Sequence, residues 1–248
     1  MLAGYLHQVE SNPYWLWIVK TDSEGNTLWN KTYASDIGNS ELQWVARQTG
    51  DGGYIAAGTH WWNDNGTERH EMWLIKTDAE GNELWNKTYT STENWAVACS
   101  VWQTTDGGYV IGGYELSPES DFGAALLIKT DPLGNEQWNK NYTDARIFSL
   151  QQTADEGYIL GGAMYYSGGS DYSDFWMLKT DQSGKTLWNR TYDCARWTQS
   201  EFEEAYSVEQ TSDGGYILAG YTDRVVDQML IRHVWVVKAD ADGNVQAD

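Results

Sequence analysis

Apolar and polar residues alternate along short runs of this chain, and each run ends in a cluster of Gly, Asp and Asn. Residues 99–142 show the pattern, where "CSVWQT", "YVIGGYE", "ALLIKT" and "EQWNKNY" are rich in β-branched and aromatic residues. Such runs, separated by glycine-containing turns, are typical of β-strands joined in hairpins. No segment has an apolar period of about 3.6 residues that is long enough for a helix. The pattern therefore predicts an all-β chain.

This four-strand pattern is repeated along the whole chain. The phrase "KTDSEGNTLWNKTY" at 20–33 returns with small changes, so that its lysine recurs at 20, 76, 129, 179 and 238, with spacings of 56, 53, 50 and 59 residues. A second phrase, "DGGY" with its variant "DEGY", precedes the later copies. Periods of about 40–50 residues and upward indicate propellers or solenoids. Four strands per repeat predict a β-propeller of about five blades.

Two sets of residues recur at fixed places in the repeat. Small residues on the second strand, such as Gly112-Gly113, Gly161-Gly162 and Ala219-Gly220, would allow neighbouring blades to approach closely. Tryptophans recur on the third and fourth strands, and we expect them to wedge one blade against the next. They are Trp17, Trp73, Trp176 and Trp235 on the third strand, and Trp29, Trp85, Trp138 and Trp188 on the fourth.

We predict a single propeller domain over residues 1–248, with blades at roughly 1–33, 34–89, 90–142, 143–192 and 193–248. The opening "MLAGY" matches the second strand "ILAGY" of a later copy, so the first blade lacks its innermost strand. The last blade has only "NVQAD" in place of a fourth strand. Three explanations of these incomplete blades remain open: a fragment of a longer array, an irregular closure, or completion by another chain.

The repeats resemble known propellers. Together, "DGGY", "KTDxxGN" and "WNKTY" look like the repeat propellers of archaeal and bacterial cell-surface proteins. Asp22, Gly25 and Trp29 are also distantly similar to the tryptophan-docking motif of quinoprotein propellers, in which the glycine lies one residue further from the aspartate. The resemblance implies architecture and carries little about activity. It does not imply a quinone cofactor, because quinoprotein dehydrogenases use more blades than these repeats supply.

Composition limits the partners. The 36 acidic and 16 basic residues give a net charge of −20, which would repel the phosphates of nucleic acids. No apolar run approaches the roughly 20 residues of a membrane helix, and the first residues lack the pattern of a signal peptide. We therefore expect no nucleic-acid partner, no membrane insertion and no cofactor. Either the mature chain begins at residue 1 or it was cut from something longer, in an extracellular or cell-envelope setting.

The sequence shows no motif that marks catalysis or metal binding. The four histidines lack zinc-ligand spacing. The run "DADGN" at 240–244 hints at a calcium loop but lacks the later glutamate, and its sister copies favour turn chemistry. Carboxylates are numerous, yet no isolated pair stands out for acid–base work. We therefore predict no catalytic residues and no metal site.

The candidate ligand site lies on the variable loops, because binding residues concentrate on loops that a rigid scaffold holds. The turns "DGG" and "DxxGN" share one face of a propeller, whereas the loops at 59–71, 115–123, 164–174 and 193–205 share the other and differ in every copy. Planar rings beside polar groups suit sugars or peptides; the alternative is that the rings pack their own loops. The predicted ligand-binding residues are His60, Trp61, Trp62, Trp95, Tyr165, Tyr166, Arg196 and Trp197.

These features favour a non-catalytic binding and scaffold propeller. Its ligand would be a carbohydrate or a surface protein, and an incomplete blade could support self-association. Two alternatives stay open. A propeller glycoside hydrolase would be marked by two carboxyl groups about 5–10 Å apart. A purely structural surface-array element would have no pocket in its loops.

Overall fold

The computed structural model describes residues 2–7, 14–33, 44–64, 66–89, 95–117, 120–166, 172–193, 202–226 and 229–245. These residues form strands and turns and contain no helix, which confirms the all-β prediction. No helix in this part of the chain is long and apolar enough to cross a membrane.

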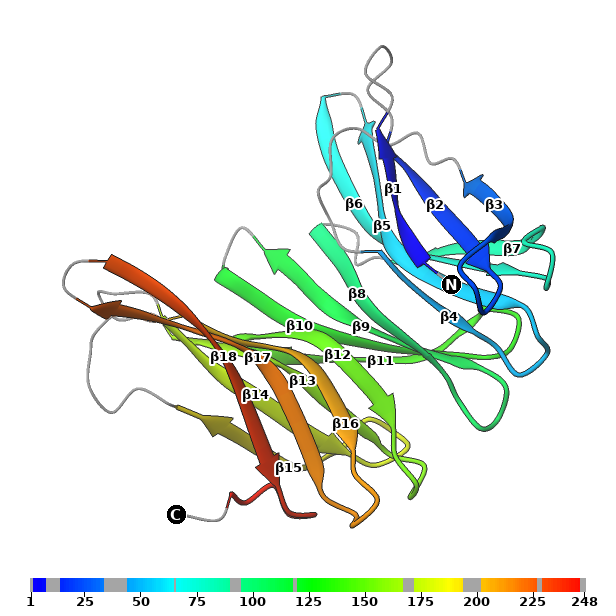
Figure 1. Ribbon diagram of the computed structural model, residues 1–248. Helices are drawn as coiled ribbons and strands as arrows, with labels where there is room; N and C mark the ends of the chain where they lie inside the picture. The colour runs from blue at the N-terminus through cyan, green and yellow to red at the C-terminus, as the bar shows by residue number, and fades with distance from the viewer. Residues whose placement is uncertain are drawn as a thin grey trace. The chain divides into compact units, whose positions relative to one another are not determined.

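The strands of the described residues form five sheets in which neighbours in the sheet are also neighbours in the chain (Figure 1). The first sheet contains β1 (Leu2–His7), β2 (Tyr14–Thr21) and β3 (Thr27–Tyr33), and the second contains β4 (Val45–Gln48), β5 (Tyr54–Asp64), β6 (Thr67–Thr77) and β7 (Glu83–Tyr89). The third sheet contains β8 (Trp95–Gln103), β9 (Tyr109–Ser117), β10 (Ser120–Thr130) and β11 (Glu136–Thr143), and the fourth contains β12 (Ala145–Gln152), β13 (Tyr158–Tyr166), β14 (Tyr172–Thr180) and β15 (Thr186–Tyr192). The fifth sheet contains β16 (Glu203–Gln210), β17 (Tyr216–Val226) and β18 (Met229–Ala239).

Sheets of this meander type, one per repeat, are the blades of a β-propeller, so the predicted fold class is confirmed. The first and the last sheet each have three strands among the described residues, in line with the incomplete blades that the sequence predicts. The chain falls into two compact units, one holding the first and second sheets and the other holding the fourth and fifth. The assignment of residues 1–248 to one domain stays a prediction.

An aspartate side chain fixes the turn between the third and fourth strand positions of the repeat, which follows β2 in the first sheet and β18 in the last. Asp22 Oδ1 accepts hydrogen bonds from the backbone N–H of Glu24 at 2.9 Å and of Asn26 at 2.8 Å. Gly25 in this turn has a φ of +87°, which glycine adopts without steric cost. Asp240 Oδ1 accepts the equivalent bonds from Asp242 and Asn244. The "DxxGN" phrase therefore serves turn formation, as the sequence favoured.

Fourth-strand residues join each complete sheet to the next. The Tyr89 hydroxyl donates a hydrogen bond of 2.7 Å to the carbonyl oxygen of Gly134, in the turn of the following sheet. The Trp85 ring lies edge-on to Tyr109 of that sheet, with 5.7 Å between ring centroids. A Cβ on Gly134 would lie 2.8 Å from the Trp85 ring. Trp85 and Tyr89 therefore dock on a glycine turn of the following sheet, which confirms the wedging role predicted for Trp85.

The first glycine of two of the small-residue pairs on the second strands also lies where sheets meet, whereas Gly162 and Gly220 face the backbone of their own sheets. A Cβ on Gly112 would lie 2.5 Å from the Leu150 side chain, and one on Gly161 would lie 2.8 Å from Val208. Leu150 and Val208 belong to the first strand of the following sheet in each case. Since no larger residue fits at these distances, the prediction of close approach between sheets is confirmed for Gly112 and Gly161.

Three of the predicted variable loops are largely strand. β5 runs to Asp64 and β6 starts at Thr67, so most of the predicted loop at 59–71 is a paired hairpin in which Trp61 lies opposite His70. The loops at 115–123 and 164–174 are shortened in the same way. The prediction of long loops was wrong because the paired strands continue into these segments.

Candidate functional site

Three carboxylates meet at the ends of strands in the fourth and fifth sheets. Asp174 lies near the start of β14, Asp193 directly follows β15, and Glu203 opens β16. One carboxylate oxygen from each lies within 4.8 Å of the others. These residues stand at the ends of the predicted loops 164–174 and 193–205, so the group occupies the variable-loop side of the two sheets.

Strand pairing brings the three side chains together. Phe175 on β14 lies opposite Tyr192 on β15, which places the residues beyond them, Asp174 and Asp193, next to each other. Glu203 is held against β14 by hydrogen bonds of 3.2 Å in which its backbone N–H donates to Ser173 Oγ and its carbonyl accepts from that hydroxyl. The contact therefore depends on the register of β14 and β15 and on the hydrogen bonds between Ser173 and Glu203.

The pKa of Asp174 is raised to about 6. Burial of its half-buried carboxyl group is the largest cause, and the negative charges of Asp193 and Glu203 raise the pKa further. A hydrogen bond from the Tyr166 hydroxyl acts in the opposite direction. Asp174 is therefore a carboxyl group that can carry a proton at mildly acidic pH.

The other two carboxylates have different surroundings. Glu203 is 1% exposed, and its Oε1 accepts a hydrogen bond of 3.0 Å from Thr222 Oγ1 on β17. Asp193 is exposed to solvent. Neighbouring carboxyl groups in unlike surroundings are the arrangement that separates an acid from a base in enzyme sites.

The group is not a requirement of the repeat. Asp174 stands five residues before the repeat lysine, Asp193 directly follows the "WNRTY" motif, and Glu203 stands eight residues before the threonine of "TSDGGY". The same three positions are Glu71, Thr90 and Ala96 at the earlier junction of the second and third repeats, and Ala124, Thr143 and Ala145 at the next. Of these three junctions, only the one with Asp174, Asp193 and Glu203 has a carboxylate at all three positions, so the fold does not need them.

A pair of tyrosines borders Asp174. Tyr166 on β13 and Tyr172 on β14 stack with ring centroids 4.9 Å apart and an interplanar angle of 19°. Tyr172 is 40% exposed, and the Tyr166 hydroxyl hydrogen-bonds to Asp174 and Thr191. The site thus combines ionisable groups with a partly exposed aromatic surface.

Tyr165 has a structural role instead. Its hydroxyl donates a 2.8 Å hydrogen bond to Glu204 Oε1, and its side chain is 5% exposed. Glu204 Oε2 accepts further bonds from Tyr206 at 2.5 Å and Tyr221 at 2.9 Å. Glu204 pairs with Tyr221 on the sheet, whereas Glu203 pairs with Thr222, so the adjacent glutamates face opposite sides of it.

The other predicted ligand residues lie mainly in the first unit. His70 on β6 stacks on Trp95 at 4.2 Å between centroids, with Trp61 edge-on at 6.3 Å. His60 lies on the opposite face of the hairpin, beside Trp73. These rings pack against one another, the alternative that the sequence left open.

The side chains of the three remaining predicted residues lie outside what the structure describes. Trp62 lies on β5, opposite Arg69. Arg196 and Trp197 lie outside the described residues. Ligand binding by the predicted set of eight stays a prediction, and the carboxylate group was not part of that set. Comparing the junctions of the repeats position by position is the signal that could have found it.

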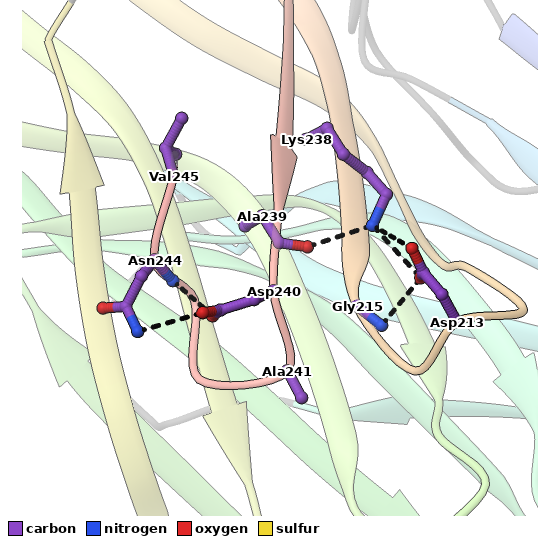
Figure 2. Close-up of a pocket in the computed structure, with 8 residues that line it drawn as sticks. All are labelled: Asp213, Gly215, Lys238, Ala239, Asp240, Ala241, Asn244 and Val245. Carbon is purple, nitrogen blue, oxygen red and sulfur yellow. Dashed lines mark hydrogen bonds and ion pairs between the residues drawn. The ribbon is translucent and has the colours of Figure 1, made fainter. Parts of the chain in front are cut away.

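A pocket of about 440 Å³ lies at the other end of the fifth sheet, between the turns that carry Asp213 and Asp240 (Figure 2). Glu203 opens β16, whereas Asp213 follows its last residue, so this pocket is separated from the carboxylate group by the length of a strand.

Comparisons with known proteins include a distant likeness to a solved structure. No protein-family model matches this sequence, and no curated protein matches it. Among solved structures, the chain is similar to an α-L-arabinofuranosidase (CtGH43) from Clostridium thermocellum, with 9% identity and a TM-score of 0.44, over 98% of this chain and 92% of that one. No residue role is transferred at this identity.

The main functional prediction is corrected. The sequence favoured a non-catalytic binding and scaffold propeller, whereas the structure brings three carboxylates together and the solved structure reported above is titled an α-L-arabinofuranosidase. The sequence singled out no isolated pair of carboxylates for acid–base work, and the absence of catalytic residues stays a prediction. The structure nevertheless brings Asp174, Asp193 and Glu203 together, although they are not adjacent in the chain.

Proposed function

We propose that this protein is a glycoside hydrolase and that Asp174, Asp193 and Glu203 carry its acid–base chemistry. The observation that carries the proposal is the group itself: three carboxylates within 4.8 Å, in unlike surroundings, at one junction of a repeat that does not require them. Glycosidases use a pair of carboxyl groups, one protonated and one ionised, on either side of the scissile bond.

The catalytic roles proposed for the three carboxyl groups follow from how deeply each is buried. Asp174, whose pKa is raised to about 6, would protonate the departing sugar oxygen. The exposed Asp193 would act at the anomeric carbon. Glu203 is inaccessible to a substrate and would act through Asp174, because its charge favours the protonated form of that residue. The spacing below 4.8 Å is nearer the roughly 5–5.5 Å of retaining enzymes than the wider gap that admits a water, so Asp193 would be the nucleophile.

The neighbouring surface suits a sugar. The ring of Tyr172 is partly exposed beside Asp174, and a planar aromatic face offers apolar contact to the C–H face of a sugar ring. The resemblance of the repeats to cell-surface propellers fits an enzyme that acts on carbohydrate outside the cell.

The test is hydrolysis of a panel of nitrophenyl glycosides, including pentofuranosides, pentopyranosides and hexopyranosides. We expect turnover of at least one substrate, and a loss of about 100-fold or more in kcat for Asp174→Asn. Glu71→Gln is the matched control, because it neutralises a carboxylate at the same repeat position two repeats earlier. It should keep full activity. Lack of turnover on the whole panel, or equal losses in both variants, would refute the proposal.

A further inference from the structure

One tyrosine links the proposed acid to the strands on both sides of it. The hydroxyl of Tyr166 on β13 forms hydrogen bonds with the carboxylate of Asp174 on β14 and with the hydroxyl of Thr191 on β15. A phenol has one proton to donate and a carboxylate can only accept, so Tyr166 donates to Asp174 and accepts from Thr191. A short chain of hydrogen bonds therefore spans three adjacent strands of the fourth sheet.

Strand pairing places these three side chains on one face of the sheet. Tyr166 lies opposite Tyr172, which stands two residues before Asp174 on β14. Thr191 lies opposite Trp176, which stands two residues after Asp174. Residues two apart on a strand point to the same face, and so do residues that lie opposite each other. The hydrogen-bond chain thus follows from the register of the fourth sheet.

The ring of Tyr166 is held by a contact that does not involve its hydroxyl. It stacks on the ring of Tyr172, with 4.9 Å between centroids and an interplanar angle of 19°. Phenylalanine at either position keeps both rings. Of the two hydroxyls, that of Tyr166 acts on the pKa of Asp174 through a hydrogen bond. The effect of this hydroxyl can therefore be measured with the ring packing intact.

The repeat does not require a tyrosine at this position. Counted from the tyrosine that starts the second strand, the place of Tyr166 is taken by Trp62 in the second repeat, Ser117 in the third and Arg224 in the fifth. Tyr166 thus departs from the repeat at the same site as the three carboxylates. Its presence beside them is explained by the site and not by the fold.

The groups that face Asp174 act on its pKa in opposite directions. The negative charges of Asp193, which follows β15, and of Glu203 on β16 raise it, whereas the hydrogen bond from Tyr166 lowers it. Burial raises the pKa of the Tyr166 hydroxyl above its ordinary value of 10.0, so the hydroxyl keeps its proton while Asp174 titrates. Tyr166 is therefore a constant donor over the pH range in which Asp174 changes its charge.

We propose that Tyr166 is the positioning residue of the proposed acid, and that its hydroxyl holds the carboxyl group of Asp174 in one orientation and stabilises its ionised form. This inference rests on the proposed function, because positioning matters to catalysis only if Asp174 donates the proton. Tyr166 itself acts through Asp174 and transfers no proton to the sugar.

The test is the pKa of Asp174 in the protein without substrate, measured by NMR titration of isotope-labelled aspartate carboxyl carbons. The signal is assigned by its absence from Asp174→Asn. We expect Tyr166→Phe to raise this pKa by roughly half a pH unit or more, because the ionised carboxylate loses a donor. Tyr172→Phe is the matched control, since it removes a hydroxyl from the other ring of the same stack, and it should leave the pKa of Asp174 unchanged. Thr191→Val should raise the pKa by less than Tyr166→Phe does.

The same variants are then assayed on a glycoside that the protein hydrolyses. Tyr166→Phe should move the alkaline limb of kcat/KM to higher pH and lower kcat about tenfold, as expected for a misaligned acid. Absence of turnover on every glycoside would refute the proposed function, and the titration would still test the hold of Tyr166 on Asp174. Positioning by Tyr166 is overturned if Tyr166→Phe leaves the pKa of Asp174 unchanged, or if Tyr172→Phe raises it equally. If Tyr166→Phe does not fold, an unchanged pKa of Asp174 in Thr191→Val is the contradicting result.

Discussion

At the scale of single residues, one ion pair is repeated with different burial. Lys76 Nζ lies 2.8 Å from Asp51 Oδ2, and the lysine side chain is nearly buried whereas that of the aspartate is 57% exposed. Hydrogen bonds from Lys76 and Thr49 hold the pKa of Asp51 at about 2, below its ordinary value of 3.8. A depressed pKa in the folded state stabilises the fold above the unfolded value and loses this effect as pH falls toward 2. The pair should therefore weaken only in strong acid.

Removing Asp51 should cost more than removing its counterpart in the fifth sheet. Asp51→Asn leaves the buried ammonium group of Lys76 without its counter-ion, and we expect a loss of about 2 kcal/mol in the free energy of unfolding, after allowing for the exposure of the aspartate. Asp213→Asn should change stability much less, because Lys238 is accessible to water. Urea denaturation of both variants measures the difference. Equal losses would contradict the role assigned to burial.

At the scale of elements, sheets are joined through glycine turns that receive a tryptophan. Gly25 and Gly134 occupy the same turn position and both have positive φ, +87° and +76°. Nothing lies within 4 Å of a Cβ on Gly25, whereas one on Gly134 would meet the Trp85 ring at 2.8 Å. Comparing variants of the two glycines therefore separates the stability cost of backbone strain from the cost of disturbed packing between sheets.

Alanine at these two glycines should give different losses of stability. Gly25→Ala should cost about 1 kcal/mol, from the left-handed backbone alone. Gly134→Ala should cost about 1–3 kcal/mol more, because the added methyl group displaces Trp85. Thermal unfolding of the two variants distinguishes the cost of backbone strain from the cost of displacing Trp85. A Gly134→Ala variant as stable as Gly25→Ala would show that the sheets are not held together through this contact.

The strands and turns could be predicted from sequence. Comparing the repeat junctions can single out Asp174, Asp193 and Glu203, but their meeting in space could not be predicted. Alternation of apolar residues fixes a strand, and Asp22 and Gly25 fix a turn, from information within a few residues. Asp174 and Glu203 meet because Ser173 forms an isolated parallel bridge with Phe202, the residue before Glu203. The site therefore depends on register between sheets, which a single sequence does not show.

At the scale of the whole molecule, the net charge of −20 should make stability depend on salt. Self-repulsion of like charges opposes the compact state and is screened as ionic strength rises. We expect the midpoint of thermal unfolding to rise by roughly 3 °C between low and moderate sodium chloride, equivalent to about 1 kcal/mol. Differential scanning calorimetry at fixed pH measures this. An unchanged or lower midpoint would show that the acidic residues are already neutralised by partners within the fold.

The proposed function is tested most directly by the pH dependence of kcat/KM on the best glycoside found. If Asp174 donates the proton, kcat/KM must fall as pH rises above about 6, by about tenfold per pH unit, because the carboxyl group then loses its proton. Glu71→Gln should keep this alkaline limb, and Asp174→Asn should lose it along with most of the activity. An alkaline limb that persists in Asp174→Asn, or a rate that does not change between pH 5 and 8, would contradict the assignment of Asp174 as the acid.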